Sequence, residues 1–172
     1  MIATLSPQSQ SRALVRAPQS RRQLTFREQM TRQYWSIASR ERTLSNIVTC
    51  FSEQPMMWPL QCTAAVEQLI ELRKYVQQCL HLLSTLEPAM TQRLRPYGCI
   101  CKLTDLNAQL TEVILEIAMF GPICQSVCFQ RVSLHITLQV LFRRLLLTYE
   151  DTVSQLDALM SHEREEAVHD LK

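Results

Sequence analysis

PICQSVCFQRVSLHITLQVLFRRLLLTYEDTVSQLDALM, residues 122–160, is the stretch that decides the fold. Its main row of side chains repeats at alternating steps of four and three residues, and further apolar side chains widen that row. The row consists of Leu134, Leu138, Leu141, Leu145, Thr148 and Thr152, and the residues that widen it are Ile136, Val140, Phe142, Leu146 and Leu147. This spacing predicts a single long α-helix with a broad apolar face.

The length of this helix is informative in itself. At about 1.5 Å per residue it would be roughly 60 Å long, which is more than a compact domain of this size needs. We therefore expect part of the helix to project or to meet another chain. Most of the charged residues in 150–172 are acidic, so we expect the end of the helix to be exposed to solvent.

Composition limits the fold class. The chain has 172 residues, of which 47% are hydrophobic, and this is enough for one domain with a packed core. It contains only 2 glycines, whereas doubly wound sheets and phosphate-binding loops need glycine at positions of positive φ or close approach to a ligand. Good helix formers dominate instead. We predict an all-α fold: an antiparallel helical bundle with coiled-coil-like seams and a long C-terminal helix.

The first of the other helices is expected to begin at Thr25, whose hydroxyl caps it while Glu28 reaches back in a capping box. Its apolar row continues to Phe51 and is broken only at Glu41. A second helix is expected over about residues 60–86.

A third helix is predicted to begin at Thr104 or Asp105, both of which are suitable caps. Residues 88–103, before it, are expected to form a loop that reverses the chain. Gly121 and Pro122 then separate the third helix from the last one.

Three regions follow from charge and periodicity. Residues 1–23 contain no acid and are rich in Ser, Gln and Arg, so we expect a flexible basic tail. Residues 24–161 are expected to form the helical bundle and coiled-coil domain. Residues 162–172 are expected to form an acidic C-terminal end.

The cysteines provide the one sharp hypothesis about a metal. Cys99 and Cys101 fall on the expected reversing loop, and Cys124 and Cys128 are four residues apart at the start of the last helix. If the loop folds onto that helix, the four thiolates can surround a zinc ion. The spacing is not that of a standard zinc motif, so we expect four unligated thiols and no cofactor.

No sequence motif indicates catalysis. A Walker loop, GxGxxG, GxSxG and a kinase signature are all missing from the sequence. His162, Glu166 and His169 share one helix face but do not form the HExxH pattern of a zinc protease, and a solvated acidic face explains them. We therefore expect no enzyme activity and no small-molecule substrate. The arginines of the tail can supply only salt-sensitive, nonspecific contacts, so no specific nucleic acid is expected.

Contacts with partner proteins are expected at the last helix and at one corner. The apolar stripe of the last helix continues beyond residue 152 without an obvious mate in this chain, and two prolines enclose an apolar Met-Met-Trp corner at residues 55–59. The residues predicted to bind a partner are Leu141, Leu145, Leu156, Leu159, Met160, Met57 and Trp58.

In kind, the chain resembles the small, glycine-poor, all-helical subunits of augmin and kinetochore complexes, although this is a likeness of architecture alone. We therefore expect a non-enzymatic helical scaffold or adaptor subunit of a multiprotein assembly, of the cytoskeletal or cell-division type. It would act through helix-helix contacts with helical protein partners in a hetero-oligomer.

Two other classes stay open. A viral accessory protein that binds and blocks a host factor would fit the excess of Arg over Lys and the scattered Cys and Met. A mitochondrial helical protein would fit the Arg-rich, acid-free start. The odd number of cysteines, 7, and the lack of an apolar secretory signal predict an intracellular protein, cytoplasmic or nuclear, with reduced thiols. We expect no transmembrane segment.

Overall fold

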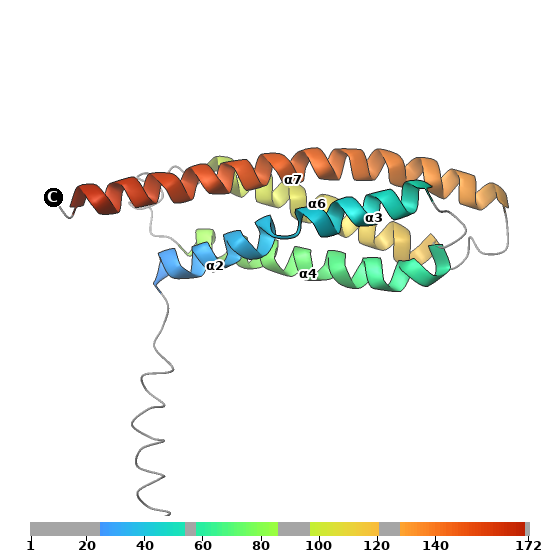
Figure 1. Cartoon of the computed structure of the whole chain (residues 1–172), viewed down its shortest axis with the longest axis horizontal. Helices are drawn as coiled ribbons and strands as arrows, with labels where there is room; N and C mark the ends of the chain where they lie inside the picture. The colour runs from blue at the N-terminus through green and yellow to red at the C-terminus, as the bar shows by residue number, and fades with distance from the viewer. Residues whose placement is uncertain (1–24, 54–57, 86–96, 121–127, 171–172) are drawn as a thin grey trace, which may run out of the picture.

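The computed structural model describes residues 25–53, 58–85, 97–120 and 128–170, with side chains described for 25–52, 62–85, 98–119 and 135–161. The described residues form helices α2 (Phe26–Ala38), α3 (Glu41–Glu53), α4 (Trp58–Ser84), α6 (Tyr97–Phe120) and α7 (Cys128–Asp170), without strands among them (Figure 1). The all-α helical bundle predicted from composition is confirmed.

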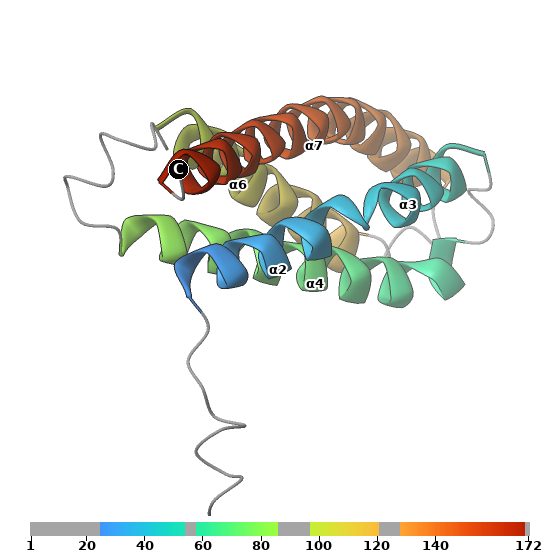
Figure 2. The same cartoon turned by 60° about the vertical axis from the view of Figure 1, so that its left-hand side comes forward.

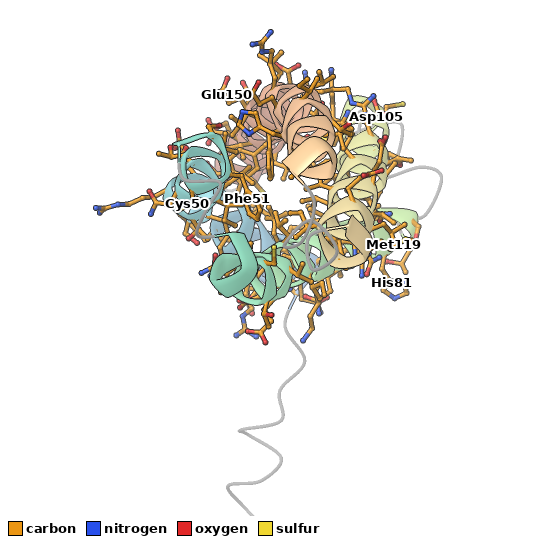
Figure 3. The ribbon with its side chains drawn as sticks, turned by 90° about the vertical axis from the view of Figure 1, so that its right-hand side faces the viewer. Cys50, Phe51, His81, Asp105, Met119 and Glu150 are labelled. Carbon is orange, nitrogen blue, oxygen red and sulfur yellow. The ribbon has the colours of Figure 1, made fainter. Side chains whose placement is uncertain are left out.

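The helices surround one core as four sides of a ring. α7 packs on α6, and α6 packs on α4 (Figure 2). α2 and α3 follow each other along the bundle and form its first arm, which packs on α4 on one side and on α7 on the other. Neighbouring sides are antiparallel. For example, Lys102 near the start of α6 pairs with Asp151, whereas Glu112 further along α6 pairs with the earlier Arg144 of α7. Viewed along the bundle, Phe51 lies inside the ring and Glu150 on its outer side (Figure 3).

The first arm begins as predicted. The Thr25 hydroxyl accepts a hydrogen bond from the backbone N–H of Glu28 at 3.2 Å, so Thr25 is the N-cap of α2. The expected continuous helix to Phe51 is wrong, because α2 ends at Ala38 and α3 begins at Glu41.

A residue of the last helix occupies this break. Tyr149 of α7 is buried, and its hydroxyl donates to the carbonyl oxygen of Ile37 at 2.7 Å and lies 3.1 Å from that of Ala38. The Ile37 carbonyl also accepts from the backbone N–H of Arg40 at 3.1 Å, so the Tyr149 hydroxyl is an additional donor at this helix end, where carbonyls have few partners within the helix. The interruption of the apolar row at Glu41 is the sequence signal that marks the break.

The predicted start of the third helix is also wrong, because α6 begins at Tyr97. The Thr104 hydroxyl donates to the Ile100 carbonyl at 2.7 Å, which is an interior position and not a cap. Burial explains the longer helix. Cys99 and Leu103 are both buried, so the apolar row begins about one and a half turns before residues 104 and 105.

α7 is the longest helix, with 43 residues, and spans roughly 65 Å. Its C-terminal end runs past the starts of α2 and α6, so part of it projects as expected (Figure 1). Its buried residues keep the predicted spacing; they are Leu138, Leu141, Phe142, Leu145, Tyr149, Thr152, Leu156, Leu159 and Met160. No helix in the described part of the chain is long and apolar enough to cross a membrane.

Candidate interaction surfaces

The predicted partner-binding stripe of α7 lies inside the bundle. The side chains of Leu141, Leu145, Leu156, Leu159 and Met160 are all buried within this one chain. They are core residues of this chain, and their predicted contact with a partner stays a prediction. Met57 lies outside the described residues, and Trp58 begins α4 with a side chain that is not described.

Two neighbouring helices cover the part of α7 that was expected to lack a mate. The Tyr34 hydroxyl of α2 donates to the Asp157 carboxylate at 3.3 Å. From the other side, the Cys99 thiol of α6 donates to the Gln155 carbonyl at 3.3 Å. The early start of α6 thus provides part of the cover that the sequence did not reveal.

The structure does not bring the four candidate zinc ligands together. Cys99 and Cys101 lie in α6 and not on a loop, and their spacing of two residues leaves Cys99 buried and Cys101 exposed. Cys128 begins α7 about 40 Å along that helix from Gln155, the contact of Cys99. Cys124 lies outside the described residues. The described residues contain no group of three or more His, Cys, Asp or Glu side chains placed to hold a metal ion.

Two buried thiols, Cys79 of α4 and Cys99 of α6, are close enough for the charge of one to affect the other. Burial raises the pKa of Cys79 to about 12, with a further contribution from the charge of Cys99, and burial raises the pKa of Cys99 to about 11. A thiol that stays protonated is a poor nucleophile and a poor metal ligand. The chemistry of this pair therefore favours a packing role.

The first exposed apolar surface is on α7. Ile136, Val140 and Leu147 are 57%, 64% and 60% exposed, and we call them the α7 outer row. Their spacing of four and seven residues places them on one side of the helix. The sequence reading placed them beside the buried row, whereas the structure turns them away from the core.

The second exposed surface, which we call the α4–α6 patch, consists of Ile70, Leu115 and Met119. Arg73 of α4 donates to the Thr111 hydroxyl of α6 at 3.4 Å. Ile70 lies one turn before Arg73, and Leu115 one turn after Thr111. Because the two helices are antiparallel, both turns advance in the same direction along the bundle, which places Ile70 and Leu115 at neighbouring positions on the two helices.

Met119 continues the α4–α6 patch by one further turn of α6 and lies on the outer side of the ring (Figure 3). Among the described residues one more large apolar side chain is exposed: Trp35 of α2, which packs against Tyr34 with ring centroids 5.3 Å apart. These side chains lie off the apolar rows of their helices, but periodicity alone does not show whether another helix covers them, because their cover depends on which helices become neighbours.

Comparisons with protein-family models, with curated proteins and with solved structures found no match. Function is therefore inferred from the chemistry of the surfaces.

Proposed function

We propose that this protein is a non-enzymatic helical scaffold or adaptor subunit that holds helical partners in a larger assembly. The observation that carries the proposal is the gathering of exposed apolar side chains on the α7 outer row and the α4–α6 patch, which together hold six of the seven such side chains in the described part of the chain. Exposed apolar side chains scattered singly are normal, whereas contiguous exposed apolar patches mark contact sites.

The spacing within each surface indicates the kind of partner. Leu115 and Met119 are four residues apart, and the α7 outer row repeats at four and seven residues. This is the spacing by which an amphipathic helix meets a groove or another helix. We propose partners that are themselves amphipathic helices, as in assemblies of the cytoskeletal or cell-division type.

The buried polar groups support a structural role. The Tyr149 hydroxyl is engaged at the α2 break, and the Thr152 hydroxyl donates to the Thr148 carbonyl at 2.7 Å within its own helix. Burial raises the pKa of Tyr149 above its ordinary value, which keeps the group neutral and able to donate. The Tyr149 contact holds α7 against the end of α2, and a neutral hydroxyl engaged in this way supplies no base to a substrate.

The test is affinity capture with the full chain, from cells that naturally express it, followed by mass spectrometry. We expect the wild type to recover helical proteins in stoichiometric amounts and the variant Leu115→Lys to lose at least one of them. Gln68→Lys, which adds the same charge at another exposed position, is the matched control. Recovery of no partner by the wild type, or equal recovery by Leu115→Lys, would contradict the role of the α4–α6 patch.

A further inference from the structure

The outward side of α7 continues beyond the α7 outer row with residues of a different kind. We call the whole set the outer face of α7, and all its members are exposed. They are Ile136, Val140, Arg143, Leu147, Glu150, Ser154 and Ala158. Steps of three and four residues keep them on one side of the helix, opposite the buried row.

The outer face of α7 is complementary to itself when it is reversed about Leu147. Val140 lies seven residues before Leu147, and Ser154 lies seven residues after it. Ile136 and Ala158 are each eleven residues away from Leu147. In an antiparallel pair of α7 helices centred on Leu147, the large aliphatic side chains of one copy would face the small side chains of the other. Small residues allow two helices to approach closely.

Charge is arranged in the same way. Arg143 lies four residues before Leu147 and Glu150 three residues after it. The antiparallel pair would therefore place each Arg143 within one residue, about 1.5 Å along the axis, of the position opposite the Glu150 of the other copy. Within the described part of the chain these two side chains form no ion pair, whereas their neighbours Arg144 and Asp151 pair with α6. Among the described charged side chains of α7, Arg143 and Glu150 are thus the two without an ion pair or hydrogen bond to the rest of the chain, since Asp157 accepts from Tyr34.

We propose that the occupant of the outer face of α7 is a second copy of this chain, in an antiparallel, two-fold symmetric dimer. The proposal deepens the proposed scaffold function, on which it rests, by naming the partner of one of the two surfaces. A parallel pair in register is disfavoured because it would place Arg143 against Arg143 and Glu150 against Glu150. It would also place the large side chains of Ile136 and Val140 against the same side chains of the other copy.

The size of the face sets the strength of the dimer. From Ile136 to Ala158 the face is about 33 Å long, and a helix with its side chains is about 10 Å wide, which gives roughly 300–400 Å² per copy. Stable complexes bury about 800 Å² per partner. The dimer is therefore weak and depends on concentration, and its ion pairs make it weaker at high salt.

The test is sedimentation equilibrium of the full chain over a wide range of concentration. We expect the wild type to dimerise, and Arg143→Glu and Glu150→Arg each to raise the dissociation constant at least about tenfold, because each change replaces two attractive pairs by two repulsive ones. The double variant Arg143→Glu/Glu150→Arg restores both pairs in exchanged positions and should dimerise as the wild type does.

Matched controls separate this pairing from a general effect of charge. Arg42→Glu and Glu67→Arg make the same changes at exposed positions on α3 and α4 and should leave the dissociation constant unchanged. All the altered residues are exposed, so equal melting temperatures of the variants would show that each one folds.

The dimer proposal is overturned if the wild type stays monomeric at every concentration, if Arg143→Glu acts no more strongly than Arg42→Glu, or if the double variant does not recover. Its failure is distinguishable from failure of the scaffold function. A monomer that still captures partners through the α4–α6 patch would refute the dimer alone. A dimer that captures no other protein would refute the wider scaffold function and leave the dimer intact.

Discussion

At the scale of single residues, Tyr149 shows how one hydroxyl fixes the relation between two helices. It reaches from α7 to the carbonyls of Ile37 and Ala38, where α2 ends. The Ile37 carbonyl keeps the backbone N–H of Arg40 as a donor, so loss of the hydroxyl removes one buried hydrogen bond and leaves the Ala38 carbonyl without this contact. Water cannot readily replace a hydrogen bond lost from a buried site.

We therefore expect Tyr149→Phe to lower the free energy of unfolding by about 1–2 kcal/mol. Tyr75→Phe is the control, since the Tyr75 hydroxyl donates to the exposed Glu71 carboxylate at 3.0 Å and its loss should cost less than about 0.5 kcal/mol. Urea denaturation monitored by circular dichroism measures both. Equal losses in the two variants would contradict the role assigned to Tyr149.

The buried thiols make a prediction about pH. The pKa of Cys79 is raised from 9.0 to about 12 and that of Cys99 from 9.0 to about 11, so the folded chain holds these protons after the unfolded chain has released them. Stability from these groups is fully present below pH 9 and is lost as the pH rises from 9 through the folded values.

The expected result is a free energy of unfolding that falls between about pH 9 and 12, with a shallower fall in Cys79→Ala. Cys101→Ala removes one thiol from an exposed position and serves as the control. Denaturant titrations at several pH values measure the slopes. Parallel curves for Cys79→Ala and the wild type would show that the buried Cys79 thiol does not contribute to the pH dependence.

At the scale of elements, α7 presents one side to the core and the other to solvent. Leu145 is fully buried whereas Leu147, two residues later, is 60% exposed. Leu145→Ala should cost about 2–5 kcal/mol, because it removes buried contacts and leaves a cavity. Leu147→Ala should change stability by no more than about 0.5 kcal/mol. Both variants replace Leu by Ala in the same helix. A similar loss of stability in both would therefore contradict the finding that α7 turns Leu145 toward the core and Leu147 toward solvent.

Helix starts supply a second comparison at this scale. Thr25 caps α2, whereas Thr104 lies inside α6. Thr25→Ala should cost about 1 kcal/mol, and Thr104→Ala should change stability by less than about 0.5 kcal/mol. Thermal unfolding of the two variants measures the difference. A larger loss of stability for Thr104→Ala than for Thr25→Ala would instead support the prediction that the third helix begins at Thr104.

The elements also show which features the sequence could predict. The core spacing of α7 and the cap at Thr25 were predictable, because helical periodicity and capping depend on nearby residues. The start of α6 was not, since Thr104 and Asp105 are suitable caps that also occur inside helices. The exposed Leu147 and the buried Leu156 belong to similar apolar rows, and only the packing of the other helices decides which row is covered.

In the molecule as a whole, the first arm, α2 and α3, completes the ring of helices because it packs against α7 as well as against α4. α2 contacts both α4 and α7, and its Met30 and Ile37 are fully buried. Without α2, one side of Leu156, Leu159 and Met160 would lose its cover. The N-terminal arm is therefore part of the core, and its beginning sets the N-terminal limit of the bundle that the structure describes.

Two deletions test this limit. Removing residues 1–22 keeps the Thr25 cap and all of α2, so we expect the melting temperature to change by less than about 3 °C, the shift that corresponds to about 1 kcal/mol in a protein of this size. Removing residues 1–38 takes away α2 and should abolish cooperative unfolding, because it uncovers the apolar core along one side. Scanning calorimetry measures both. A cooperative transition that survives the longer deletion would show that α3, α4, α6 and α7 form a sufficient core, and a large fall after the shorter one would place part of the core before residue 23.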